Sequence, residues 1–203
     1  MALCLSGDFD PEETFALIDR YFSSWENPGT LRPEPRWQEP PLKGREFVQV
    51  DYLGEEQVVV AFRTASRHHP DYPALRLVDM ILDNSVAGLI NLDLVERQRV
   101  RGAGCYPQNL NDHGAHYLFG IPKEGQTLEE VEKLLLSQVE RVRNGDFEDW
   151  ILDAVINDFK KRQKESYESN AKRVELMRDT FLSLDRKSTR LNSSHLVISY
   201  AVF

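Results

Sequence analysis

The sequence has little cysteine, little basic charge and no long apolar run, and each shortage excludes a class of protein. Its two cysteines, Cys4 and Cys105, do not support a disulfide framework, and both lie in strand-like surroundings where a small buried apolar side chain is expected. Lys and Arg number 25 against 33 Asp and Glu. The resulting net charge of −8 argues against a general binder of nucleic acid or anionic membrane. No apolar run reaches the roughly 18 residues of a membrane span.

Sequence motifs that mark an enzyme are also missing. Neither H-x-x-E-H nor H-E-x-x-H occurs, and there is no nucleophile elbow, phosphate-binding loop or dinucleotide fingerprint. No carboxylate or thiol stands at ligand spacing from a histidine, so turn and surface positions are expected for all of them. The histidines are His68, His69, His113, His116 and His195. We therefore expect no metal site and no catalytic residue in this chain.

What is present is a core-forming pattern over residues 70–142, in a chain of which 41% is apolar. Apolar residues spaced for helices, and then for strands, predict two helices, two strands and a third helix in succession. These elements span about 74–82, 86–98, 102–110, 115–122 and 128–142. A turn is predicted at 111–114, and Tyr117, Phe119 and Ile121 are expected on one face of the second strand. Thr127 and Glu130 form a capping box that begins the third helix, and Gly145 is expected to end it in a left-handed conformation.

Further elements are predicted on the N-terminal side of this core. Ala2–Ser6 has the composition of a strand, and Asp10 is expected to cap a helix that Pro11 begins. Two more strands are predicted over 47–50 and 57–63. The second is expected to be a central strand, because an uninterrupted apolar run is typical of a strand covered on both faces.

On the C-terminal side, Asp146 is expected to cap another helix, which either continues through its charged part or breaks near Ser169. The segment 185–203 has no capping pattern and resembles a translated sequencing-adapter tail, so it is not expected to belong to the fold. The proposed division of the chain is an end piece of an upstream domain, a proline-rich linker, a main domain and this tail. Their ranges are 1–24, 25–45, 46–184 and 185–203.

Basic residues crowd the end of the second predicted helix, at Arg97, Arg99 and Arg101. They are expected to complement the negative end of that helix, and the alternative role is contact with a carboxylate or the backbone of a bound peptide. Gly102 and Gly104 follow directly and are expected to let strands pack closely rather than to bind phosphate.

Four stretches, in their order along about Ala2–Leu184, resemble the insulinase/pitrilysin family of zinc metallopeptidases. They are Leu5–Glu12, Glu39–Leu42 in the proline-rich linker, Arg67–Gln98 and Gly125–Val131. The resemblance implies an α+β fold of the metallopeptidase (LuxS/insulinase-like) type, in which helices cover a mixed or antiparallel sheet in two layers. Family members pair such domains into a chamber that encloses unfolded peptides, and one domain carries H-x-x-E-H, which binds zinc and activates water.

The resemblance also implies a pair of substrate contacts, an arginine and a tyrosine seven residues later. One alignment register places Val95 and Gly102 at these positions, which removes the pair. The other places Arg99 and Tyr106 there, which keeps the spacing and makes these two the candidate substrate-binding residues.

The predicted function is that of a non-catalytic part of a zinc endopeptidase, and the chain alone is expected to be inactive. It would help to enclose a peptide substrate, while a homologous peptidase domain, in cis or in a partner subunit, supplies the zinc. The alternative is an interaction or scaffold subunit of the same fold. We expect a soluble chain without its N-terminal targeting region, and the sequence does not define a compartment.

Overall fold

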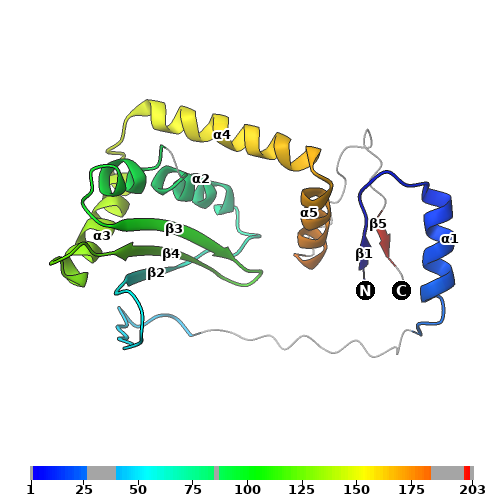
Figure 1. The fold of residues 1–203 in the computed structure, drawn as a ribbon, viewed down its shortest axis with the longest axis horizontal. Coiled ribbons are helices and arrows are strands. Elements are labelled where there is room, and N and C mark those ends of the chain that lie inside the picture. The colour runs from blue at the N-terminus through cyan, green and yellow to red at the C-terminus, as the bar shows by residue number, and fades with distance from the viewer. Residues whose placement is uncertain (1, 27–39, 85–86, 184–198, 202–203) are drawn as a thin grey trace.

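The computed structural model describes residues 2–26, 40–84, 87–183 and 199–201. Most of the secondary structure forms one body around a small sheet, and a helix and a pair of short strands lie at the other end of the long axis (Figure 1). The elements are β1 (Ala2–Cys4), α1 (Pro11–Phe22), β2 (Val58–Thr64), α2 (Tyr72–Leu82), the π-helix η1 (Ile90–Val95), β3 (Gly102–Asn109), β4 (Gly114–Ile121), α3 (Leu128–Asn144), α4 (Asp149–Glu168), α5 (Asn170–Leu182) and β5 (Ser199–Ala201).

The main sheet is antiparallel, with the strand order β2-β4-β3. Because β4 pairs with both neighbours, it is the central strand, and the prediction that β2 would be central is wrong. The apolar run that suggested a central strand is only partly covered, since Val59 and Phe62 keep 49% and 38% of their surface exposed. Among the described residues, no strand pairs with the outer edge of β2.

The strand predicted over 47–50 is also wrong. These residues have an irregular backbone, and Phe47, Val48 and Val50 are 75%, 81% and 72% exposed. A strand needs a neighbour to satisfy its backbone N–H and C=O groups, and the described part of the chain provides none for this segment. Alternating apolar composition was therefore insufficient to specify a strand here.

Helices α2, α3 and η1 cover one face of the main sheet, which confirms the two-layer α+β fold (Figure 1). The core between the layers is apolar and closely packed, and Leu118 of the central strand is completely buried in it. Its buried members are Leu82, Ile90, Leu94, Val100, Leu118, Val131 and Leu135. A second cluster, in which Ile81 meets Val155, packs α4 on the outer side of α2.

Most ends of the helices follow the predicted capping signals, but α4 begins after Glu148 and not after Asp146, which was expected to cap it. The Thr127 hydroxyl accepts a hydrogen bond from the backbone N–H of Glu130, whose carboxylate accepts one from the N–H of Thr127. Gly145 ends α3 with a φ of +67°, a conformation that glycine adopts without a steric penalty. Ser169 separates α4 from α5 and caps the latter, so the charged helix breaks rather than continues.

The second predicted helix of the core is present as a π-helix rather than an α-helix. Its backbone hydrogen bonds join residues that are five positions apart instead of four, as in the 2.8 Å bond from the N–H of Glu96 to the carbonyl of Asn91. The turn that follows places Gln98 at a φ of +53°, the only described residue other than glycine with a positive φ. This conformation is uncommon for a residue with a side chain and brings the chain sharply from η1 into β3.

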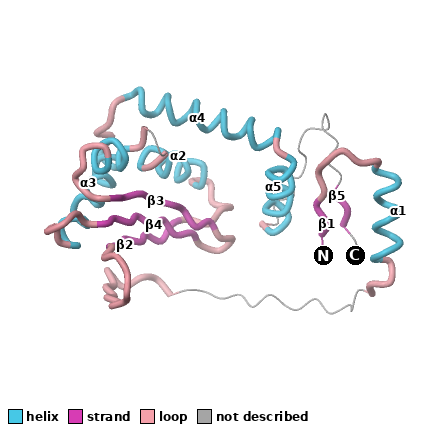
Figure 2. The backbone as a smooth tube through the Cα atoms, viewed as in Figure 1, coloured by secondary structure: helices cyan, strands magenta, loops and turns pink. Residues whose placement is uncertain are grey.

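At the N-terminal end, β1 and α1 lie apart from the main sheet, with β1 beside α5 (Figure 2). Asp10 caps α1 by accepting a hydrogen bond from the N–H of Glu13, as predicted. β1 pairs with β5, three residues of the tail that was not expected to belong to the fold. Most of the predicted proline-rich linker, residues 27–39, lies outside the described residues.

The close approach of α3 to the sheet at Gly120 gives a stability prediction. A Cβ atom there would lie 2.4 Å from Cγ1 of Val131, which is completely buried. We expect Gly120→Ala to lower the free energy of unfolding by about 1–3 kcal/mol, because the crowded interface would have to separate. Urea denaturation followed by circular dichroism measures this change.

Gly102→Ala is the matched control, because its Cβ would make only an ordinary 3.5 Å contact with the Ile121 side chain. Its unfolding midpoint should stay close to that of the unmodified chain. Equal midpoints for the two variants would show that α3 does not press on the sheet in this way.

Candidate functional site

The face of the main sheet opposite the helices carries a group of apolar and aromatic side chains. Alternation along β4 sends Leu118 and Gly120 toward α3, so Tyr117, Phe119 and Ile121 point the other way. We call this group the open face and define it as Val59, Tyr106, Tyr117, Phe119 and Ile121. The prediction that Tyr117, Phe119 and Ile121 share one side of the strand fits this arrangement.

Aromatic contacts organise the open face. The Tyr106 and Tyr117 rings stack with their centroids 5.1 Å apart, and Phe119 lies 6.5 Å from Tyr106. Tyr106 is 50% exposed, and Val59 is almost equally exposed across from Phe119. Gly104 makes room for this packing, since a Cβ there would lie 2.9 Å from the Phe119 ring. This supports the predicted role in close packing for Gly104, whereas a Cβ at Gly102 would make only an ordinary contact.

The arginines at the end of η1 converge on the Asp93 carboxylate, which is 13% exposed. Arg97 approaches one oxygen at 3.0 Å and Arg99 the other at 2.8 Å. Gln138, completely buried on α3, donates a hydrogen bond of 2.9 Å to the second oxygen, and Arg141 lies 3.8 Å from it. The arginines were predicted to complement a helix end, but the partner of Arg97 and Arg99 is this carboxylate within the helix, and Arg101 pairs with Glu55 instead.

The structure separates the two candidate substrate-binding residues. The Arg99 guanidinium is held in the helix layer by Asp93, and its carbonyl accepts a hydrogen bond from Gln126. Tyr106 lies on the open face, four residues along β3 from Gly102, a distance of about 13 Å at the usual rise of a strand. Among the described contacts, none joins Arg99 to Tyr106.

A polar cluster lies between α2 and the helix-facing side of the sheet. Nε2 of His116 is 2.8 Å from Oδ1 of Asp79, and Sγ of Cys105 is 3.6 Å from the same oxygen. One possible ligand atom from each residue lies within 4.8 Å of the others. Only 13% of the His116 side chain is exposed, so the prediction of a turn or surface position is wrong for this histidine.

Cys105 is more than a small apolar side chain in this cluster. Burial, followed by the negative charges of Asp79 and Asp83 and a hydrogen bond to Asp79, raises the pKa of its thiol far above the usual range. The backbone N–H of Cys105 donates to Oδ2 of Asp83 at 3.1 Å. A thiol held in its neutral form is a poor nucleophile, so the cluster does not have the properties of a cysteine-dependent catalytic site.

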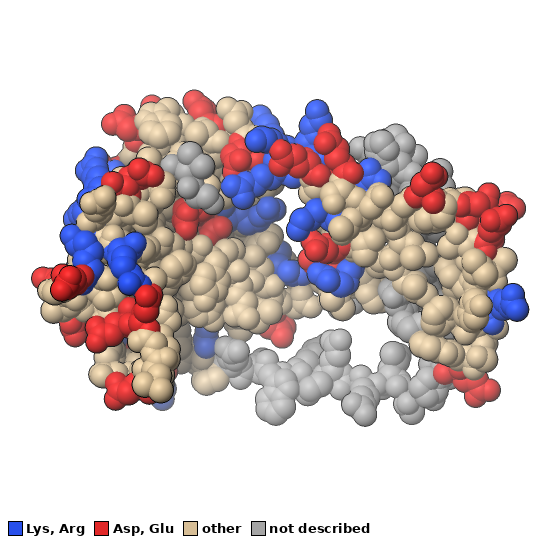
Figure 3. Space-filling view, in the orientation of Figure 1, with Lys and Arg blue, Asp and Glu red and all other residues tan. Residues whose placement is uncertain are grey.

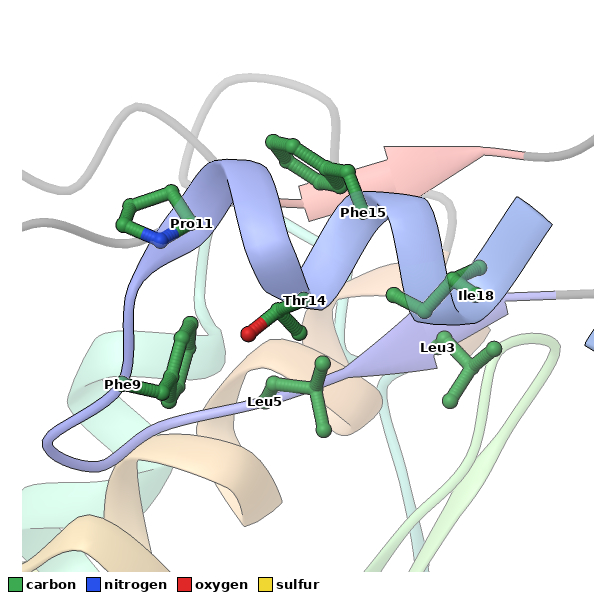
Figure 4. Close-up of a pocket in the computed structure, with 7 residues that line it drawn as sticks. All are labelled: Leu3, Leu5, Phe9, Pro11, Thr14, Phe15 and Ile18. Atoms are coloured by element: carbon green, nitrogen blue, oxygen red, sulfur yellow. The ribbon is translucent and has the colours of Figure 1, made fainter. Parts of the chain in front are cut away.

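An apolar hollow between β1 and α1 has no such chemistry (Figure 4). Its lining residues are Leu3, Leu5, Phe9, Pro11, Thr14, Phe15 and Ile18. The one hydroxyl among them, on Thr14, already donates to the carbonyl of Asp10 at 2.6 Å. The hollow therefore presents mainly apolar surface.

The charged side chains do not form a continuous surface of one sign on the face that Figure 3 shows, where acidic and basic groups are interspersed. This agrees with the acidic net charge in giving no sign of a nucleic-acid interface on that face. None of the described helices is both long and apolar enough to cross a membrane.

The fold and the site together define the class of this chain: a two-layer α+β domain without a catalytic motif. Residues 1–159 match the family described as the Peptidase M16 inactive domain. The chain therefore belongs to the M16 peptidase family, which confirms the resemblance to the insulinase group. No curated protein sequence matched the chain.

Among solved structures, the chain is similar to a protease from Helicobacter pylori, with a TM-score of 0.81 and 21% sequence identity. The likeness covers 90% of this chain and 45% of the protease, so the chain spans less than half of that protein's length. At this identity the comparison establishes the fold.

The polar cluster was missed by sequence reasoning because its members come from three separate elements. The predicted turn at 111–114 would pair Leu110 with Ala115, whereas the structure pairs Asn109 with Gly114. This change by two positions keeps every side chain on its predicted face but brings His116 closer to Cys105. The signal that could have found the cluster was the register of the hairpin, together with a polar residue, Asp79, on the apolar side of a helix.

The contacts of Asp93 generate a second stability prediction. Asp93→Ala would remove the acceptor that the surrounding guanidinium groups share with the buried Gln138 amide, which would keep only its bond to Ser137. We therefore expect a loss of about 1.5–3 kcal/mol in the free energy of unfolding. Glu140→Ala is the control, because its ion pair with Arg143 is exposed on both sides and is worth at most about 1 kcal/mol. Chemical denaturation of both variants measures the difference, and similar losses would contradict a central role for Asp93.

Proposed function

We propose that this chain is a non-catalytic part of an M16-family peptidase whose open face helps to enclose an unfolded peptide. The observation that carries the proposal is the open face itself, an aromatic surface on a sheet whose other side is closed by helices. It occurs in a chain of the inactive-domain family that contains no H-x-x-E-H sequence.

Aromatic rings suit this task because they bind apolar side chains without requiring one particular sequence. Tyr106 and Tyr117 form a stacked pair that carries phenolic hydroxyl groups, that of Tyr117 donating to Gln108. The pair can therefore contact both apolar and polar parts of a peptide. The outer edge of β2 adds backbone groups that an extended segment could pair with. A peptide on the open face would thus be held by chemistry common to all unfolded chains.

The zinc ion and the catalytic base would come from a homologous peptidase domain, in the same polypeptide or in a partner subunit. In such an assembly the open face would form one wall of a chamber, and the cut would be made at the opposite wall. In this proposal Tyr106 contacts the peptide directly, and Arg99 contacts it near the start of β3 while it remains paired with Asp93.

Binding of a fluorescently labelled, unfolded peptide rich in apolar residues tests this function. We expect the chain to bind the peptide and leave it uncut, and a Tyr106→Ser/Phe119→Ser variant to bind at least about tenfold more weakly, equivalent to 1.4 kcal/mol. Fluorescence anisotropy measures the affinity, and mass spectrometry of the recovered peptide measures cleavage. Arg99→Ala in the same assay should weaken binding less, because its side chain is already paired.

Trp150→Ser is the matched control, since Trp150 is an equally exposed aromatic residue on α4, away from the sheet. It should bind the peptide like the unmodified chain. Equal affinities for all the variants would remove the open face from the function. Binding of a homologous peptidase domain, with none of the free peptide, would replace this proposal by the scaffold role.

A further inference from the structure

The polar cluster formed by Asp79, Cys105 and His116 has a donor set that the proposed peptide-binding function does not use. It combines one carboxylate, one thiol and one imidazole, each from a different element of the domain. The three side chains lie in the half-buried space where α2 crosses the sheet, on the side opposite the open face. A cluster of this kind either stabilises itself by hydrogen bonds or holds an ion.

Two separate contacts of the fold bring the three donors together: the pairing of β3 with β4 and the packing of α2 on β3. Across the hairpin, Cys105 pairs with Leu118 and Pro107 pairs with His116, so Cys105 and His116 are diagonal neighbours on the helix-facing side. Asp79 comes from α2, which packs on β3. The backbone around Cys105 is fixed by the bond from its N–H to Asp83, so the thiol has a defined direction.

We infer that Asp79, Cys105 and His116 form a zinc-binding site that links α2 to β3 and β4, with water as the fourth ligand. The sequence predicted no metal site, because no two of these residues stand at a recognisable ligand spacing. This site is separate from the peptidase motif of the family, and its role is to join the two layers of the domain.

The distances fit the coordination geometry of zinc. Usual zinc–ligand bond lengths and tetrahedral angles place a thiolate sulfur and a carboxylate oxygen about 3.5 Å apart, and an imidazole nitrogen and a carboxylate oxygen about 3.3 Å apart. The corresponding separations are 3.6 Å for Cys105 and Asp79 and 2.8 Å for His116 and Asp79. Of these two separations, only that between His116 and Asp79 must widen, by about 0.5 Å, which a small rotation of the Asp79 side chain provides. The possible ligand atoms of Cys105 and His116 lie within 4.8 Å of each other.

The donor types select the metal. A thiolate is a poor ligand for magnesium and calcium, which prefer oxygen, whereas sulfur, nitrogen and oxygen together in a tetrahedral arrangement are typical of zinc. Zinc takes the place of the proton on the Cys105 thiol, and that proton leaves to solvent. The partial exposure of the Asp79 and His116 side chains, 20% and 13%, leaves a route for the ion and room for the bound water.

Metal binding by the full 203-residue chain tests the inference, with zinc chloride as the probe and a chromophoric chelator as the competitor. We expect one zinc ion per chain, and at least about a 100-fold loss of affinity in Cys105→Ser and in His116→Ala, since even the partners of ligands are commonly worth 10-fold to 100-fold. Cys4→Ser and His113→Ala are the matched controls and should bind zinc normally. Circular dichroism establishes that each variant is folded.

Two further measurements keep the test decisive if a variant fails to fold. Cobalt(II) bound to the unmodified chain should show a thiolate charge-transfer band and the visible bands of tetrahedral coordination. Zinc should also slow the alkylation of Cys105, and not that of Cys4, when the modified peptides are quantified by mass spectrometry. Absence of zinc binding, zinc binding that is equal in the ligand and control variants, or alkylation of Cys105 at the same rate with and without zinc would each overturn the site.

Discussion

The packing of α3 and α2 on one side of a three-stranded sheet is the constraint on which the rest of the structure depends. Gly120 lets the buried side chains of Val131 and Leu135 approach the central strand, and this fixes which side of β4 faces the helices. Because side chains alternate along a strand, that one choice also assigns Tyr117 and Phe119 to the opposite side. The packing of α3 on β4 therefore determines the position of both the aromatic open face and the polar cluster on the opposite side of the sheet.

Much of this arrangement was predictable from local sequence signals. The capping box at Thr127, the left-handed Gly145 and the break at Ser169 are decided by neighbouring residues, and the structure has all three. The predicted strands of the β3–β4 hairpin were also correct to within about one residue at their ends, because turn residues and apolar alternation lie next to each other in the chain. The two-layer fold, in contrast, was implied by the resemblance to the insulinase/pitrilysin family, and the structure has it.

Most of the failures concern contacts between distant segments. The irregular backbone at 47–50 and the edge position of β2 depend on which strands are available as neighbours, and apolar composition does not contain that information. The same holds for the Asp93 contacts, where η1, the following turn and α3 meet. The π-helix and the positive φ of Gln98 belong to this meeting point, since a regular helix through the same residues would direct the arginines elsewhere.

The unpaired edge of β2 and the exposed apolar segment before it also influence how the molecule behaves at high concentration. The backbone groups along one edge of β2 lack a described strand partner, and Phe47, Val48 and Leu53, which precede β2 in the chain, are largely or fully exposed to solvent. An unpaired edge strand beside exposed apolar residues favours intermolecular β-pairing, in which the edge strands of two copies hydrogen-bond to each other. Self-association through this edge is consequently a route by which the isolated chain would lose solubility, and a lysine introduced there would oppose it by charge repulsion.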